Sequence, residues 1–173
     1  MRSYLKQEDK DKMTVLSVET FKLEFFPQFP KGSRILGIDV GRKRIGLALS
    51  DPCFMIASPF KVIDRKTFGE VSGQLLKIIE AEDVEGLVVG LPLEMRGDEG
   101  RSSQSVRHFV YNFLKLKDLP IVFWDERYST VAVTRTLLEA DMSRERRSQV
   151  VDKMAASFIL QGFLDALKGS FTL

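Results

Sequence analysis

The order of the apolar segments is the feature that most restricts how this chain can fold. Strand-like segments come first, at residues 35–39, 45–51 and 59–64. Helical and strand-like segments then alternate along the rest of the chain. In chain order we expect a helix at 67–83, a strand at 86–92, a helix at 102–116, a strand at 121–125, and helices at 129–140 and 150–167. This order predicts an α/β protein with a mixed sheet and helices on both of its faces.

Local patterns support these assignments. The segments 35–39 and 45–51 flank the turn sequence Gly-Arg-Lys-Arg, which indicates a hairpin. The stretch 86–92 is a continuous apolar run, as expected of a strand that is buried on both faces. The predicted helix at 67–83 has apolar residues at helical spacing, namely Val71, Leu75, Ile78 and Ile79.

The chain of 173 residues is long enough for one domain with a single core. We place this domain at residues 34–168 and treat 169–173 as a tail. Residues 1–33 form an N-terminal extension that we expect to be partly disordered. A short helix is predicted there, beginning at Ser17 and stopped by Pro27, with its phenylalanines largely on one side: Phe21, Phe25 and Phe26.

Composition excludes several kinds of site. The net charge is only +2, so anion binding has to come from local patches. The single cysteine, Cys53, excludes an internal disulfide and a cysteine-based zinc site, and it fits a reducing cytoplasm. The single histidine, His108, excludes a zinc site with two histidines and is expected to be an ordinary helix residue. With so few histidines and cysteines, catalysis would rest on carboxylates, cations and a metal. We find no signal peptide and no apolar run long enough to cross a membrane.

Acidic residues end two of the predicted strands and face the core from the last helix. Asp39 follows the first apolar run, and Asp125 and Glu126 follow the last one, where ligands of open α/β sheets collect. Trp124, beside these acids, is expected to pack beneath them. Asp152 shares a helix face with the apolar residues Ala155, Ala156, Ile159 and Phe163, so it should point toward the sheet and needs a positive partner, either a divalent cation or an Arg or Lys side chain.

Carboxylates that converge without histidine or thiolate suit Mg²⁺ or Mn²⁺. The cations in the turn after Asp39 would then flank an anionic substrate such as a phosphodiester; they are Arg42, Lys43 and Arg44. Gly41 would let the backbone of that substrate approach. A turn-capping role for the acids and a solvated basic turn remain as alternatives at this point.

At these residues the sequence resembles the YqgF (RuvX) family, described as bacterial pre-16S rRNA nucleases and earlier as Holliday junction resolvase-like. The motifs that carry the resemblance are GIDVGRKRIGLALSD, VVGLPLEMRGDEG, DERYST and VVDKMAASFIL, in the order and spacing of the family from residue 35 to about 167. The resemblance implies an RNase H-like fold, with a five-stranded mixed sheet whose first three strands are antiparallel. The chain departs from the family pattern in the basic stretch SRERRSQV before Asp152, where relatives carry lysine and glycine.

The resemblance also implies an activity, that of a hydrolase of ester bonds. The implied enzyme is a metal-dependent endonuclease that matures the 5′ end of pre-16S rRNA during ribosome biogenesis. Its acidic residues fall on Asp39, Glu126 and Asp152, with Asp125 as a further candidate metal ligand. Lys43 and Arg127 match basic positions of the family, and Ser129 and Thr130 match hydroxyls that would cap a helix. The expected partners are nucleic acid, with structured RNA favoured and branched DNA as the alternative, and pre-ribosomal particles; no membrane is expected.

Other readings remain open on the sequence alone. A Holliday junction resolvase would need two active sites related by a twofold axis, whereas the expected state is a monomer or weak homodimer. An actin-like ATPase or sugar kinase would need two related lobes, and the chain supplies one such motif. A non-catalytic RNA-binding module would keep the basic turn and would not need the acids.

Overall fold

The apolar runs of the sequence form a six-stranded sheet with the strand order β1-β6-β5-β2-β3-β4. The computed structural model of the protein describes residues 15–93, 100–126 and 144–169. The hairpin predicted around the Gly-Arg-Lys-Arg turn is present, with β2 (Arg34–Val40) antiparallel to β3 (Arg44–Ser50). The next strand, β4 (Ala57–Asp64), is antiparallel to β3, so the first three predicted strands are antiparallel as expected.

The remaining predicted strands run parallel to β2. The continuous apolar run forms β5 (Val84–Leu91), which pairs with β2, and β6 (Ile121–Asp125) pairs with β5. The mixed sheet is therefore confirmed. Because β2, β5 and β6 are parallel, their carboxyl ends lie at one edge of the sheet, which we call the carboxyl edge.

The predicted strand count of five was wrong by one strand. The additional strand, β1 (Val15–Leu16), comes from the N-terminal extension and pairs parallel with β6. Two residues are too few to show strand periodicity, so the pairing depends on the neighbouring strand and not on a local pattern.

A helical segment follows β1 and packs into the core. It winds through α1 (Val18–Thr20), a π-helical turn η1 (Phe21–Phe25) and a 3₁₀ turn η2 (Phe26–Gln28). The helix begins at the predicted Ser17, whose hydroxyl accepts a hydrogen bond from the Thr20 N–H at 3.0 Å. The ring of Phe21 is fully buried and meets Phe163 edge-on, with 5.2 Å between the ring centroids.

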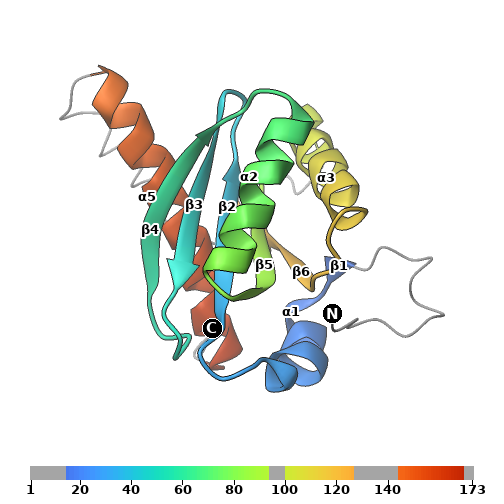
Figure 1. Ribbon diagram of the computed structural model, residues 1–173. Helices are drawn as coiled ribbons and strands as arrows, with labels where there is room; N and C mark the ends of the chain where they lie inside the picture. The colour runs from blue at the N-terminus through green and yellow to red at the C-terminus, as the bar shows by residue number, and fades with distance from the viewer. Residues whose placement is uncertain (1–14, 94–99, 127–143, 170–173) are drawn as a thin grey trace.

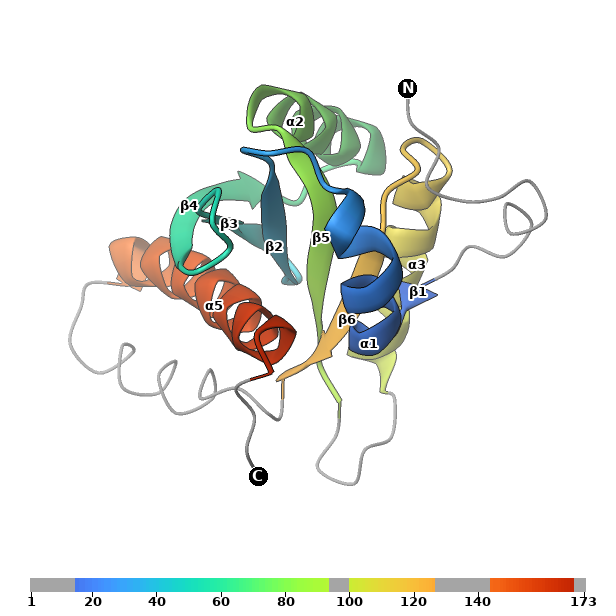
Figure 2. The same ribbon diagram turned by 90° about the horizontal axis from the view of Figure 1, so that it is seen from below.

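Helices cover both faces of the sheet, as predicted. Figures 1 and 2 show α2 (Phe68–Ala81) and α3 (Arg101–Leu114) on one face and α5 (Arg144–Leu167) on the other, beside the N-terminal helical segment. The charged stretch expected as a loop before the last helix is partly helical, because α5 already begins at Arg144. The helix predicted at 129–140 lies outside the described residues.

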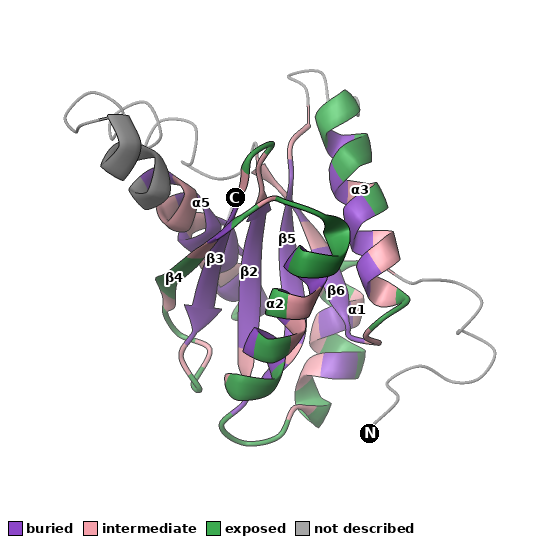
Figure 3. Ribbon diagram, turned by 45° about the horizontal axis from the view of Figure 1, so that its top comes forward, coloured by how far each residue is buried: buried purple, intermediate pink, exposed green. Residues whose placement is uncertain are grey.

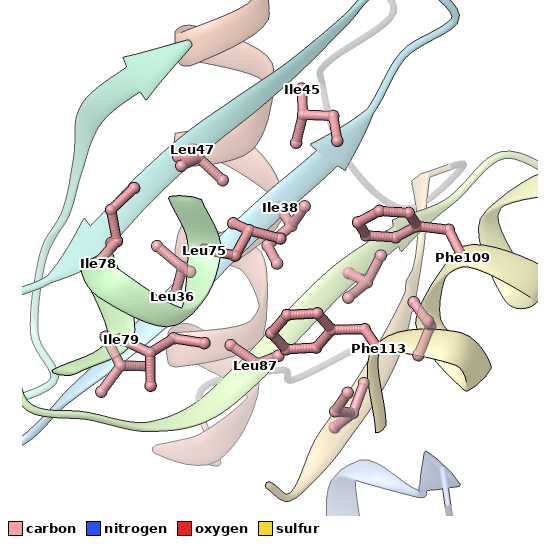
Figure 4. Packing of buried hydrophobic residues seen from close by; sticks show 14 of the residues in the cluster. Leu36, Ile38, Ile45, Leu47, Leu75, Ile78, Ile79, Leu87, Phe109 and Phe113 are labelled. Atoms are coloured by element: carbon pink, nitrogen blue, oxygen red, sulfur yellow. The ribbon is translucent and has the colours of Figure 1, made fainter. Parts of the chain in front are cut away.

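Each face of the sheet has its own hydrophobic core. Figure 4 shows the core under α2 and α3, built from large side chains such as Leu75, Leu87 and Phe113. The core under α5 includes Phe21, Trp124 and Phe163. Figure 3 shows the central strands buried between the helices, whose outer surfaces are exposed. No helix among the described residues is both long and apolar enough to cross a membrane.

Candidate functional site

At the carboxyl edge, Asp39 of β2 and Glu126, directly after β6, lie on the same face of the sheet. Asp39, near the end of β2, is only 7% exposed. Side chains alternate along a strand, so Asp39 shares the α5 face with Gly37, whose Cα faces Leu160 of α5. Across the hairpin, Asp39 lies opposite Gly46 of β3.

Glu126 follows β6 directly and lies over β5. A Cβ atom added at Gly90 would come within 2.6 Å of the Glu126 Oε1 atom, so the carboxylate occupies the space above this glycine. The register pairs Ile38 with Val89, which makes Asp39 and Gly90 the next residues on their neighbouring strands. Strands in a sheet are about 4.8 Å apart. The Glu126 carboxylate therefore lies on the same face as Asp39, one strand away.

The third acid, Asp152, reaches this face because α5 lies directly on the sheet. A Cβ atom at Gly46 would overlap the Asp152 carbonyl oxygen, and one at Gly37 would come within 3.0 Å of the Ala156 carbonyl oxygen. Ala155 and Ala156, the alanines expected on the inner face of α5, are both buried. The glycines of the strands are as important as those alanines, because they let the main chain of α5 touch β2 and β3. Sequence reasoning missed this pairing of strand glycines with helix backbone.

Asp152 has the positive partner that its position required. The Arg44 Nε atom lies 3.1 Å from its Oδ2 atom, and both side chains are about one quarter exposed, at 25% and 23%. Arg44 was expected to flank the substrate together with its neighbours in the turn. The structure instead directs it to the α5 face, because it is the first residue of β3 and shares that face with Gly46.

The turn between β2 and β3 is held by a residue that the sequence analysis did not single out. The Arg65 guanidinium donates to the Gly41 carbonyl oxygen at 2.9 Å, and the Arg65 backbone N–H donates to the Lys43 carbonyl oxygen at 2.8 Å. A Cβ atom at Gly41 would come within 2.6 Å of the Arg44 carbonyl oxygen, so closing the turn accounts for this glycine. Arg42 and Lys43 are both exposed at its tip.

Of the predicted site residues that the structure describes, Asp125 is directed away from the α5 face. Asp125 is paired with Leu91, which belongs to the core under α2 and α3, so strand alternation directs Asp125 to that opposite face. Arg127 lies outside the described residues, together with Ser129 and Thr130. Trp124 packs beneath the acids as expected, 8% exposed and edge-on to Phe163.

The donor atoms of the site have the chemistry of a magnesium or manganese site, since carboxylate oxygens are the ligands that these ions prefer. Within the described part of the chain, however, no three His, Cys, Asp or Glu residues are grouped closely enough to hold a metal ion. The ion pair between Asp152 and Arg44 lies in this region. For Asp152 to bind a metal together with Asp39 and Glu126, its carboxylate would have to be shared with, or released from, Arg44.

The chain is similar in sequence to one protein family and to named members of it. The family model described as "RuvX: Holliday junction resolvase" matches residues 33–166. A relative from Paramagnetospirillum magneticum, named "Putative pre-16S rRNA nuclease", is 54% identical over 146 residues, which cover 84% of this chain and 94% of the relative. A relative of the same name from Caulobacter vibrioides is 46% identical over 159 residues, covering 91% of this chain and 99% of its own.

A solved structure shares the fold. The structure described as "T. thermophilus RuvC in complex with Holliday junction substrate" matches with a TM-score of 0.50 and 13% identity, over 79% of this chain and 96% of that one. At this identity the match concerns the fold alone. The RNase H-like architecture implied by the sequence motifs is therefore confirmed, apart from the added strand β1.

Proposed function

We propose a function on the premise that this chain belongs to the RuvX family, whose model matches residues 33–166. The family and the named relatives make the protein a hydrolase that acts on the ester bonds of nucleic acid. The specific proposal is a divalent-metal-dependent endonuclease. The observation that carries it is the arrangement on the α5 face, where the Glu126 carboxylate lies over β5, the strand next to that of Asp39, and α5 brings the main chain of Asp152 against Gly46.

In this proposal Asp39, Glu126 and Asp152 would hold Mg²⁺ or Mn²⁺. When bound, the ion would supply a water of lowered pKa and charge stabilisation for the leaving oxygen of a phosphodiester. Asp125 is not included in the ligand set, because strand alternation directs it to the other face. The burial of Asp39 and the contact of the Asp152 main chain with Gly46 fix the positions of these two residues before substrate arrives, while the Asp152 carboxylate is paired with Arg44.

The cations divide into two roles. Arg42 and Lys43 are exposed at the tip of the turn and are placed to contact substrate phosphates. Arg44 is a positioning residue, because its guanidinium pairs with the Asp152 carboxylate. Arg127 keeps the phosphate contact that the resemblance implies. Binding through such contacts weakens as salt rises.

The substrate that we propose is structured RNA, specifically the 5′ end of pre-16S rRNA in a pre-ribosomal particle, and the compartment is the cytoplasm. The names of the relatives support this choice. A four-way DNA junction is the second candidate, supported by the description of the family.

The experiment that tests this function is a cleavage assay of the full chain and its Asp39→Asn variant. A precursor fragment of 16S rRNA and a four-way DNA junction are offered in parallel, with Mg²⁺, with Mn²⁺ and with EDTA. Glu80→Gln is the matched control, because it removes a carboxylate from an exposed position on α2. We expect cutting of the RNA that requires metal, is lost in Asp39→Asn and is kept in Glu80→Gln.

The other outcomes separate the alternatives. Paired symmetric cuts in the junction, with the RNA intact, would favour the resolvase. Equal nucleic-acid binding by both proteins, with no cutting of either substrate, would contradict the nuclease proposal and favour the binding module.

A further inference from the structure

A pocket of about 210 Å³ lies on the face of the sheet opposite the acids, between the first turns of α2 and the middle of α3. Ligand pockets in proteins are commonly about 300 Å³ or larger, so this one suits one part of a larger ligand. Figure 1 shows the start of α2 at the same end of the sheet as the turn between β2 and β3. The lining residues are Arg65, Lys66, Thr67, Phe68, Val71, Ser105, His108, Phe109 and Asn112.

The charge of this pocket favours an anionic ligand. Arg65 and Lys66 contribute two cations, and none of the described lining residues is acidic. Two acidic residues flank this segment without lining the pocket. Asp64 is exposed at the end of β4, and the Glu70 carboxylate accepts hydrogen bonds from the Thr67 hydroxyl at 2.7 Å and the Thr67 N–H at 3.2 Å. The bond from the Thr67 N–H, together with one from the Glu70 N–H to the Thr67 hydroxyl at 3.3 Å, forms the capping box that begins α2.

The other lining groups suit a nucleobase. Phe68 is an aromatic ring left 39% exposed, and it meets the buried ring of Phe109 edge-on at 5.8 Å. On α3, the Asn112 Nδ2 and His108 Nε2 atoms lie 3.2 Å apart, and Lys115 donates to the Asn112 Oδ1 atom at 3.2 Å. An exposed aromatic face together with oriented amide and imidazole groups is the combination that proteins use to bind unpaired bases.

Arg65 connects the pocket to the proposed active site. Its guanidinium lines the pocket, donates to the Ser105 hydroxyl at 3.1 Å and also donates to the Gly41 carbonyl oxygen in the turn. The exposed cations Arg42 and Lys43 follow in the same turn. A strand whose phosphates lie on this turn therefore has the acids on one side and the pocket on the other.

We propose that this pocket binds one unpaired nucleotide of the nucleic acid that the active site cuts, with the base against Phe68 and the phosphate toward Lys66. The inference rests on the proposed nuclease function for the identity of the larger ligand. The pocket would fix the distance between an unpaired nucleotide and the position of cutting.

The single histidine of the chain gives a direct way to test this proposal. The ring signals of His108 in an NMR spectrum report on the pocket alone. We expect them to shift and saturate when adenosine 5′-monophosphate is added, and to move much less with ribose 5-phosphate or inorganic phosphate. Equal shifts with inorganic phosphate would show an anion site only and would overturn the proposal, as would no shift with any of the three.

Variants test the same pocket with a nucleic acid. Binding of a labelled single-stranded RNA is measured in the Asp39→Asn background, so that no cutting occurs. Phe68→Ala is expected to weaken binding by about five-fold or more, the usual cost of losing one stacked base. Lys66→Ala should also weaken it, whereas Lys77→Ala, which removes an exposed lysine of α2 outside the pocket, should not. Equal binding by Phe68→Ala and its parent would overturn the proposal.

The two proposals fail separately. If Asp39-dependent cutting occurs but the His108 signals and the Phe68→Ala affinity do not change, the nuclease stands and the pocket proposal falls. If no cutting occurs but nucleotides bind at His108, the pocket stands and the nuclease proposal falls.

Discussion

The two faces of the sheet hold their helices in different ways. Under α5 the strands present small residues, and at Gly37 and Gly46 the helix backbone touches the strand backbone. Under α2 and α3 the alternate residues of the same strands are large, such as Leu36 and Ile38, and the contact is between side chains. Backbone contact fixes a helix residue such as Asp152 more tightly than side-chain packing does. The face with the close contact carries the acids, and the other carries the pocket.

The largest expected effect on stability is on the side-chain-packed face. Leu75→Ala removes a fully buried side chain of α2 and should lower the free energy of unfolding by about 2–5 kcal/mol. Its effect on cutting should be small at temperatures where the variant is folded, because α2 does not carry the acids. Urea unfolding and a cleavage assay below the transition measure both quantities. Loss of cutting in the folded variant would contradict the separation of the two faces.

On the α5 face a much smaller change should damage the site. Gly46→Ala adds one methyl group that would overlap the Asp152 carbonyl oxygen, so α5 must shift. We expect the free energy of unfolding to fall by about 3 kcal/mol, at the upper end for overpacking, and cutting to be lost. The matched control is Gly73→Ala in α2, where the added Cβ meets nothing within 4 Å. In that control the free energy of unfolding should rise by up to about 1 kcal/mol. Equal stability and equal cutting by the two variants would contradict the close contact at Gly46.

The ion pair at the site should have a smaller effect on stability but a specific effect on metal binding. Arg44→Ala removes the partner of Asp152, at a cost of about 1 kcal/mol or less for a partly exposed pair. Because the metal no longer competes with the guanidinium, Mn²⁺ should bind more tightly in calorimetry. Arg42→Ala is the control and should weaken nucleic-acid binding with little change in metal affinity. The assignment of Arg44 to Asp152 fails if Arg44→Ala reduces nucleic-acid affinity as much as Arg42→Ala and leaves metal affinity unchanged.

The smallest expected effect lies away from both faces, at the end of β3. Backbone N–H groups of Ile56, Met55 and Cys53 donate to the Asp51 carboxylate and lower its pKa below the ordinary value of 3.8. The charged form is therefore favoured in the folded protein. This contribution to stability is present above pH 3.8 and is lost as the pH falls through the lowered pKa. Unfolding of the chain and of Asp51→Asn over this range should show a small difference in stability that disappears in acid.

Much of the fold follows from local sequence patterns. The antiparallel hairpin, the buried run of β5 and the stripe that directs Asp152 toward the sheet all depend on periodicity within one segment. The positions of Asp39 and Glu126 at the carboxyl edge follow from acids placed near the ends of apolar strands.

The features that were missed depend on two distant segments. The two residues of β1 form a strand only by pairing with β6. The Arg65 guanidinium donates a hydrogen bond to the Gly41 carbonyl oxygen, 24 residues earlier in the chain. The ion pair of Arg44 likewise needs α5 to lie against β3. No pattern within one segment shows such contacts.

The strand β1 also has a consequence for assembly. Within the described chain it pairs with Ile121 and Val122, so it covers the first part of the edge of β6, which would otherwise offer unpaired backbone groups to another chain. At the opposite edge, β4 contains Pro59 and a register shift against β3, and both features disfavour the addition of a further strand. These features favour helices or loops over a continuous sheet as the contact between two copies that act together on a four-way junction.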